Sequence, residues 1–295
     1  TSFVPKGMSK LALKDSKEAI IKEEKIVQGA EENFDPKIAA KYTKTPSKID
    51  RATEPPYGKA PKLSVPNVWK NELSNGIKVF GIENSEVPLV RFNLVIDGGQ
   101  LLEKMDKLGV ANLTASLMNR GTKNKTVAQL QEAVQELGAS IRVSASKENI
   151  TISGTTLAKN YTKTLVLAEE ILLEPRWDKT EFELLKRSVV GNLRQQEASP
   201  TTIAGNVFNG LIYGENNIRS KNTLGTIESI GKITLEDLKA FYTNYISPSV
   251  AKMHIVGDIN QDNVVASLQN LASNWEVKEV TIPVYKTPEA PNKPT

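Results

Sequence analysis

Apolar and polar residues alternate in several short runs of the chain, and this spacing predicts strands. Residues 68–73 and 77–82 form two such runs around Ser74-Asn75-Gly76. Asn-Gly between alternating runs is the strongest short-range signal for a β-hairpin, so we expect these two strands to pair. Further strands are expected over residues 89–96, 139–146, 148–156 and 251–256.

Other segments repeat their apolar residues every three or four positions, which predicts helices. Thr126 and Thr234 stand at expected helix N-caps, with Gln129 and Asp237 three residues later. Helices are predicted over residues 127–137, 157–173, 179–199, 201–212, 235–245 and 262–272. Because strands and helices are grouped rather than strictly alternating, we expect an α+β fold in which helices pack on one face of a largely antiparallel mixed sheet.

The segment from Gly109 to Thr122 is the one around which the rest of the chain is organised. It is predicted to form a helix followed by a turn, with an apolar face that packs on the sheet. A second stripe of small or short polar residues occupies positions i, i+3, i+4 and i+7, namely Asn112, Ala115, Ser116 and Asn119. Such a stripe is either a solvated helix face or a former site that has lost its chemistry.

Composition limits what this stripe can do. The chain has no cysteine and a single histidine, His254, which lies far along the sequence. Protein zinc sites almost always include Cys or His ligands. A hydrolytic zinc site also needs a general base beside the metal-bound water, and Ala115 cannot serve as one. We therefore expect neither a metal nor a catalytic residue on this helix.

Charge and proline divide the chain into unlike parts. The net charge of +4 arises in residues 1–62, which hold 13 Lys or Arg and 9 Asp or Glu, whereas the remainder has 25 of each sign. Seven of the fifteen prolines fall within residues 1–66, so this part is predicted to be an interdomain linker containing one helix over residues 16–32. The folded domain is expected over 67–280, followed by a tail over 281–295.

Several partner classes are not expected. Basic and aromatic residues form no cluster of the kind that nucleic-acid binders concentrate on one face. No apolar run approaches the roughly 18 residues of a membrane span, and the start of the chain lacks the pattern of a signal peptide. Because the chain does not begin with methionine, we expect it to be a piece of a longer protein.

The frame of residues 109–122 resembles the zinc-binding helix of the insulinase and pitrilysin family of metallopeptidases, whose signature is His-x-x-Glu-His. Carried over residue by residue, the first His falls on Asn112, the Glu on Ala115 and the second His on Ser116. The resemblance extends from Leu73 to Asn274. It includes Leu73-Ser-Asn-Gly-Ile-Lys, Leu137-Gly-Ala-Ser-Ile, Leu224-Gly-Thr-Ile-Glu-Ser-Ile and Ile255-Val-Gly-Asp-Ile.

The resemblance also locates the family's third zinc ligand, a Glu on a later helix. It falls near Val190-Gly191-Asn192-Leu193, where no carboxylate stands, and Glu197 lies more than a turn further on. The resemblance therefore implies a repeat domain of the mitochondrial-processing-peptidase type that has lost its metal site. An Arg and a Tyr that contact substrate in the family belong to the following repeat, into which the tail over 281–295 would lead.

Family members pair two halves around an extended peptide. The resemblance implies that this chain is a non-catalytic half, that zinc belongs to a partner half with His-x-x-Glu-His, and that this partner is in the same polypeptide or a separate subunit. Asn112, Ser116 and Asn119 are then candidates to face the peptide. The alternative is a purely structural or interaction subunit with no proteolytic role. A periplasmic or otherwise extracytoplasmic bacterial setting is expected from where such enzymes are often found.

Three other features have simpler interpretations. His254 lies in a predicted strand and is expected to be a satisfied histidine of the sheet rather than a ligand. Ser144 and Lys147 match Ser-x-x-Lys, but that nucleophile normally opens a helix and this one lies in a strand. The run Gly121-Thr-Lys-Asn-Lys-Thr lacks the second glycine of a phosphate-binding loop. None of the three predicts an independent activity.

Overall fold

The computed structural model describes residues 47–50, 52–54, 57–60, 62 and 65–285 of the 295. The chain divides into two units, Thr1–Leu63 and Ser64–Thr295, and every helix and strand given below belongs to the second. The helix expected over residues 16–32 and most of the tail expected over 281–295 lie outside the described residues.

Six strands form one mixed sheet in the order β1-β2-β6-β3-β5-β4. All neighbouring pairs are antiparallel except β2 and β6, which run parallel. The expected largely antiparallel mixed sheet is therefore confirmed. The strands are β1 (Trp69–Glu72), β2 (Lys78–Glu83), β3 (Leu89–Asp97), β4 (Ser140–Ala145), β5 (Asn149–Leu157) and β6 (Ala251–Gly257).

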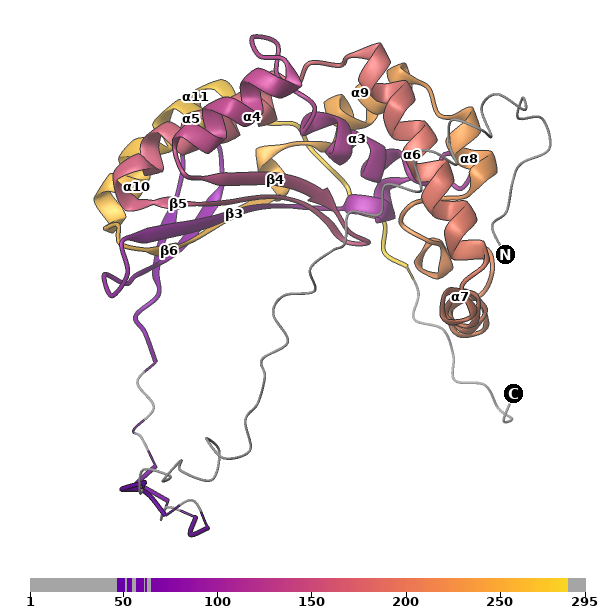
Figure 1. The fold of residues 1–295 in the computed structure, drawn as a ribbon. Helices are drawn as coiled ribbons and strands as arrows, with labels where there is room; N and C mark the ends of the chain where they lie inside the picture. The colour runs from indigo at the N-terminus through magenta and orange to yellow at the C-terminus, as the bar shows by residue number, and fades with distance from the viewer. Residues whose placement is uncertain (1–46, 51, 55–56, 61, 63–64, 286–295) are drawn as a thin grey trace, which may run out of the picture. The chain divides into compact units, whose positions relative to one another are not determined.

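Helices cover one face of the sheet, as Figure 1 shows. They are α3 (Val110–Met118), α4 (Val127–Glu136), α5 (Tyr161–Leu173), α6 (Lys179–Glu197), α7 (Pro200–Tyr213), α8 (Ile227–Lys232), α9 (Leu235–Tyr245), α10 (Gln261–Ser267) and α11 (Gln269–Asn274). Short 3-10 turns are η1 (Gly99–Leu102), η2 (Ala158–Asn160), η3 (Ile218–Ser220) and η4 (Pro248–Val250). In the described part of the chain, no helix is long and apolar enough to span a membrane.

The predicted caps place most helix starts correctly. Thr126 with Gln129, and Thr234 with Asp237, form reciprocal capping boxes at α4 and α9. The Asp178 carboxylate accepts hydrogen bonds from two backbone N–H groups at the start of α6. Two predictions differ in detail. The helix expected from residue 157 begins at Tyr161 after η2, and the last one is divided at Leu268 into α10 and α11.

The core lies between the sheet and the helices. Alternate residues of the central strands are buried, as strand geometry requires, and they include Phe92, Leu94, Ile152, Met253 and Ile255. Phe92 fills the space over Gly154, where an added Cβ would lie 2.1 Å from its ring. The other face of the sheet is more exposed. His254 lies there, stacked on Phe80 with ring centroids 5.5 Å apart.

Candidate functional site

The residue before α3, its N-cap Gly109, has a backbone conformation that favours glycine. Gly109 has φ of 96°, a left-handed conformation, and an added Cβ would lie 2.6 Å from the Leu224 carbonyl oxygen. The free N–H groups at the start of the helix are hydrogen-bonded by a side chain that lies several residues earlier in the sequence. The Glu103 carboxylate accepts hydrogen bonds from the N–H of Gly109 at 2.9 Å and of Ala111 at 2.8 Å.

Glu103 is itself a buried acid, with 7% of its surface exposed. Burial raises the pKa of Glu103 from its ordinary value of 4.5 to about 7, although the two backbone hydrogen bonds act in the opposite direction. The carboxylate is also attracted to the positive end of the α3 dipole. Nothing in the sequence near Glu103 marks it as a helix cap, since it stands six residues before Gly109.

The structure corrects the picture of one open stripe along α3. Ala115 is 1% exposed and belongs to the core, so the helix presents no continuous solvated face. Asn112 and Ser116 are partly exposed, one turn apart, and neither side chain hydrogen-bonds to another of the described residues. Around them α3 packs against β4, α6 and α9. Of the three positions that correspond to the family motif, only Asn112 and Ser116 therefore reach the surface, and both are partly buried.

Asn119 has a structural task at the end of this helix. Its Nδ2 donates to the Val143 carbonyl oxygen and to the Ala115 carbonyl oxygen, each at 2.8 Å. Its Oδ1 accepts from the Val143 N–H at 2.8 Å. The carboxamide therefore joins α3 to the edge strand β4. Asn119 was expected to face a peptide, but its donor and acceptor groups are engaged within the fold.

The segment that corresponds to the third family ligand lies on α6, next to α3. Leu193 is buried, Val190 is partly buried, and Gly191 and Asn192 are exposed, so no carboxylate reaches the former metal position from this turn. The described residues contain no group of three or more His, Cys, Asp or Glu able to hold a metal ion. Asn112, Ala115, Ser116 and Leu193 do not fit zinc, which requires His, Cys or carboxylate ligands.

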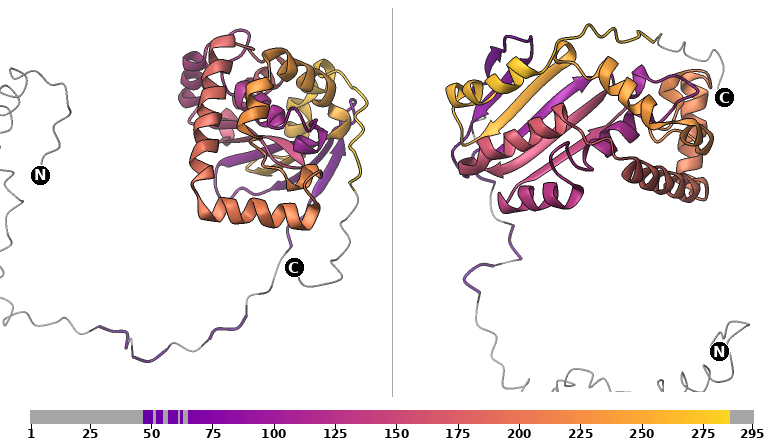
Figure 2. Two further views of the ribbon diagram at one scale, coloured as in Figure 1. Left: turned by 90° about the vertical axis from the view of Figure 1, so that its right-hand side faces the viewer. Right: turned by 90° about the horizontal axis from the view of Figure 1, so that it is seen from above.

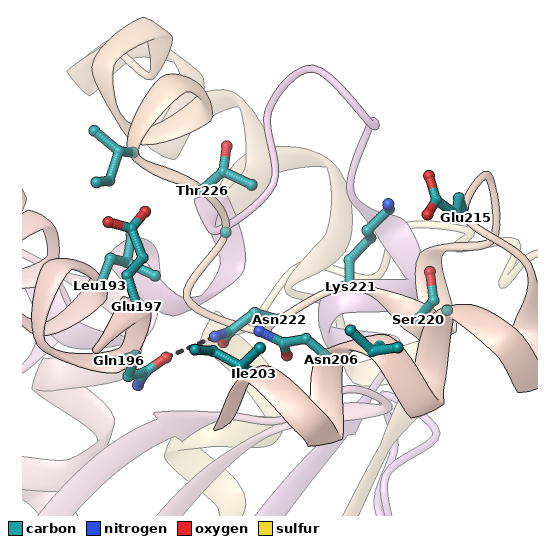
Figure 3. A pocket seen from close by; sticks show the side chains of 14 residues that line it. Leu193, Gln196, Glu197, Ile203, Asn206, Glu215, Ser220, Lys221, Asn222 and Thr226 are labelled. Carbon is teal, nitrogen blue, oxygen red and sulfur yellow. Dashed lines mark hydrogen bonds between the residues drawn. The ribbon is translucent and has the colours of Figure 1, made fainter. Parts of the chain in front are cut away.

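A cavity of about 440 Å³ adjoins this segment, between α6, α7 and the loop that precedes α8. Leu193 lines it together with Gln196, and the Gln196 Oε1 accepts a hydrogen bond from Asn222 at 2.8 Å (Figure 3). The backbone carbonyl oxygen of Asn222 also accepts a hydrogen bond from the Gln100 Nε2 at 2.8 Å. The loop is therefore tied to both α6 and η1, and the cavity has a fixed polar wall.

The remaining sequence candidates lie apart from α3 or are already engaged. Ser144 is exposed on β4 and lies in a strand, as expected. In the run that starts at Gly121, Lys125 pairs with Glu170 at 2.6 Å. The same loop is joined to Glu170 through Thr122. Because the Lys125 ammonium is paired with Glu170, it is not available to bind a phosphate.

Comparison with known families agrees with this geometry. Residues 78–218 match the family described as insulinase (peptidase family M16), and residues 232–295 match the family described as peptidase M16 inactive domain. The two matches together cover about two thirds of the chain. The chain belongs to the M16 peptidase family, and the match to the inactive-domain model makes it a non-catalytic member of that family.

Individual relatives support the same assignment. The chain is 26% identical over 188 residues to a Helicobacter pylori protein named non-peptidase homolog YmxG, covering 64% of this chain and 43% of that one. It is 28% identical over 228 residues to a Haemophilus influenzae protein named probable zinc protease PqqL, covering 74% of this chain and 24% of that one. The chain thus spans less than half the length of both relatives.

Solved structures show the same fold. A crystal structure of a peptidase M16 inactive domain from Pseudomonas fluorescens superposes with a TM-score of 0.70 at 23% identity, covering 76% of this chain and 55% of that one. The periplasmic protease PqqL from Escherichia coli superposes with a TM-score of 0.68 at 18% identity, covering 75% of this chain and 25% of that one. At these identities the likeness establishes the fold.

Proposed function

We propose that this chain is the non-catalytic half of a zinc-dependent endopeptidase, and that it helps to enclose and position a peptide for a zinc-bearing partner half. The observation that carries the proposal is that α3 has the glycine and turn residues of the family's zinc-binding helix but not the zinc ligands. The glycine at its start and the Gly121-Thr122 turn at its end remain, whereas Asn112, Ala115 and Ser116 replace the metal chemistry. A helix with the family's frame but without its metal-binding residues fits a role in shape rather than in bond cleavage.

Enclosure is a contribution that such a half can make without chemistry of its own. Holding a peptide near a catalytic group replaces a bimolecular encounter by an oriented one. Closing the site also excludes water and strengthens the electrostatic interactions within it. In this proposal the chain encloses and orients the peptide, and zinc held by the partner half would activate the attacking water and polarise the scissile carbonyl.

Asn112 and Ser116 are the residues of α3 proposed to face the peptide. Both are partly exposed, and their carboxamide and hydroxyl are not engaged by other described residues, so they can exchange hydrogen bonds with a peptide backbone. Asn119 was a third candidate on sequence grounds. Its donor and acceptor groups are engaged by Val143 and Ala115, so we retain it as a residue that positions α3 and not as a contact.

The test combines zinc analysis with reconstitution. The purified chain alone is expected to contain no stoichiometric zinc and to leave a quenched fluorescent peptide intact, and cleavage is expected after mixing with its zinc-bearing half. Ser116→Trp is expected to raise KM of the mixture, because its ring would occupy the surface of α3 on which the peptide is proposed to lie. Val166→Trp, at an exposed position of α5, serves as the matched control. Stoichiometric zinc in the isolated chain would overturn the proposal.

A purely structural role is the second candidate. It is favoured by one comparison, the relative named non-peptidase homolog, and by the closure of β4 at Val143 through Asn119. The two candidates differ in a simple observation on the source genome. A His-x-x-Glu-His motif in the same polypeptide or in a neighbouring gene supports the accessory half, and its absence from both supports the structural role.

A further inference from the structure

The cavity between α6, α7 and the loop before α8 carries charged side chains of both signs. It lies where α6 meets α7, at the border of the unit (Figure 2). Figure 3 shows Glu197 on one side of the cavity, and Lys221 with Glu215 on the other. None of these three forms an ion pair within the described part of the chain. Their charges are therefore available to a ligand that carries the opposite signs at matching places.

Between the charged groups the cavity offers carboxamides. The Oε1 of Gln196 accepts a hydrogen bond from Asn222, whereas its Nε2 donates to none of the described residues. The Asn206 carboxamide, which also lines the cavity, is not hydrogen-bonded to any described residue. A carboxamide can donate and accept. The unengaged groups of Gln196 and Asn206 therefore match the C=O and N–H groups of a peptide backbone.

Apolar side chains from three helices complete the cavity. Ile203 and Val207 come from α7, Leu193 from α6 and Ile227 from α8. Ile203 is 48% exposed and Val207 is 58% exposed, so a ligand that covers them removes apolar surface from water. The volume of about 440 Å³ lies within the range of small-ligand sites, about 300 to 1,000 Å³. These features indicate a ligand with an apolar body, amide groups and a charge of each sign.

The loop that supplies Lys221 is held in place by its neighbours. Asn222 forms hydrogen bonds of 2.8 Å with Gln196 and with Gln100. Gly225 has φ of 79°, and its backbone lies so close to the residues before α3 that an added Cβ would overlap the Leu108 carbonyl oxygen. A site whose geometry exists before binding loses less conformational freedom when a ligand arrives.

We propose that this cavity binds a short apolar peptide by its two ends, with the peptide carboxylate at Lys221 and the peptide ammonium at Glu197. A single amino acid does not fit, because its ammonium and carboxylate share one carbon atom and cannot reach opposite sides of the cavity. Glu215, on the same side as Lys221, repels a second carboxylate, so a peptide that ends in an apolar residue is preferred over an acidic one. The proposal does not rest on the function proposed above, because binding here needs neither zinc nor a partner half.

Isothermal titration calorimetry of the full chain with the tripeptide Leu-Ala-Leu tests the proposal. The peptide with unblocked ends is expected to bind with a Kd below about 1 mM, and leucine alone is expected not to bind at the same concentrations. Acetylation of the amino end and amidation of the carboxyl end are each expected to weaken binding about tenfold, because each removes a hydrogen bond between charged groups.

Two variants connect each end of the peptide to its residue. In Lys221→Met the unblocked and the amidated peptide are expected to bind equally, while acetylation still weakens binding about tenfold. In Glu197→Gln the reverse is expected, with acetylation losing its effect and amidation keeping it. Lys232→Met and Glu183→Gln change exposed residues of α8 and α6 outside the cavity, and these matched controls are expected to keep both preferences of the parent.

Circular dichroism melts verify that all four variants are folded. A parent chain that does not bind the tripeptide overturns the proposal. Equal binding of the unblocked tripeptide and of one blocked at both ends overturns it as well, since the cavity would then accept an internal segment of a longer polypeptide. A Lys221→Met or Glu197→Gln variant that keeps both preferences contradicts the roles assigned to these two residues.

Discussion

The side chain of Asn119 pairs with the backbone of Val143 as a neighbouring strand would. It donates to the carbonyl oxygen and accepts from the N–H of the same residue, both at 2.8 Å. Val143 lies on β4, which is an edge strand of the sheet. Unpaired edges invite other strands to add. At this position the edge is closed by a residue of α3, the helix that corresponds to the zinc-binding helix of the family.

This relationship predicts a clear cost for Asn119→Ala. The change removes three hydrogen bonds and leaves the polar groups of Val143 without partners in a partly buried setting. We expect the free energy of unfolding to fall by about 2 to 3 kcal/mol, because an unsatisfied buried group costs about 1 to 3 kcal/mol. Urea denaturation measures it. Asn112→Ala on the same helix is the control, with an expected change within about 0.5 kcal/mol.

Equal stability of the two alanine variants would contradict the structural role of Asn119. Asn119→Asp adds a finer test, because a carboxylate still accepts from the Val143 N–H but cannot donate to its carbonyl oxygen. Its stability is expected to lie between those of the parent and Asn119→Ala near neutral pH.

Glu103 predicts a pH dependence of stability. Burial raises its pKa from 4.5 to about 7, so the folded protein holds this proton more tightly than the unfolded chain does. The contribution of Glu103 to stability is therefore fully present below about pH 4.5 and is lost as the pH rises through about 7. The loss amounts to at most about 3 to 4 kcal/mol, since one pKa unit corresponds to about 1.4 kcal/mol.

The measurement is the free energy of unfolding of the parent and of Glu103→Gln at a series of pH values from 4 to 8. Glutamine imitates the protonated carboxyl, so the difference between the two proteins isolates the titration of Glu103 from that of other groups. We expect the parent to lose stability relative to the variant as the pH rises. Parallel pH profiles would show that Glu103 does not titrate in this range.

Local signals in the sequence were enough for much of the fold. The Asn75-Gly76 turn, with Gly76 at φ of 86°, joins β1 and β2 as expected, and the caps at Thr126 and Thr234 mark true helix starts. These features depend on residues within a few positions of one another. The degenerate ligand positions could also be read from the sequence, because the residues that bind zinc are few in kind.

The pairing of strands that are distant in the sequence could not be predicted from the sequence. Nothing in Ala251–Gly257 indicates that β6 inserts between β2 and β3, because the hydrogen bonds of a strand are the same for any partner. The burial of Ala115 and the pairing of Asn119 with Val143, 24 residues away, depend on how α3 meets β4. Helical periodicity located the stripe on α3, but it could not tell which of its members face solvent.

Gly109→Ala predicts a large loss of stability from a single methyl group. Gly109 has φ of 96°, and the new Cβ would lie 2.6 Å from the Leu224 carbonyl oxygen and 2.8 Å from Ile230. We expect the unfolding free energy to fall by at least about 2 kcal/mol, because strained backbone and overpacking both contribute. Gly191→Ala is the matched control. Its Cβ meets nothing within 4 Å on α6, so it is expected to stabilise by up to about 1 kcal/mol.

Thermal denaturation followed by circular dichroism distinguishes the two glycine variants. The expected melting temperatures lie on opposite sides of the parent. If Gly109→Ala melted with the parent, the close approach of Leu224 to the start of α3 would not hold in solution.

Introducing the family motif tests whether the loss of zinc binding is due to these three residues alone or also to their surroundings. The triple variant Asn112→His, Ala115→Glu, Ser116→His recreates His-x-x-Glu-His on α3. Ala115 is 1% exposed, so the new carboxylate is forced into the core. We expect a loss of more than about 3 kcal/mol in unfolding free energy, as for other uncompensated buried charges. We also expect zinc well below one ion per chain, because the turn Val190–Leu193 of α6 carries no carboxylate.

Adding Leu193→Glu to the triple variant separates the effect of the missing third ligand from the effect of the carboxylate buried at position 115. If the missing third ligand limits binding, the quadruple variant gains zinc by elemental analysis and is stabilised against urea by added zinc, whereas the triple variant is not. Asn192→Glu, on the exposed side of the same turn, is the control and is expected to restore nothing. Stoichiometric zinc in the triple variant would mean that the third ligand comes from elsewhere in the chain and that the correspondence at Val190–Leu193 is wrong.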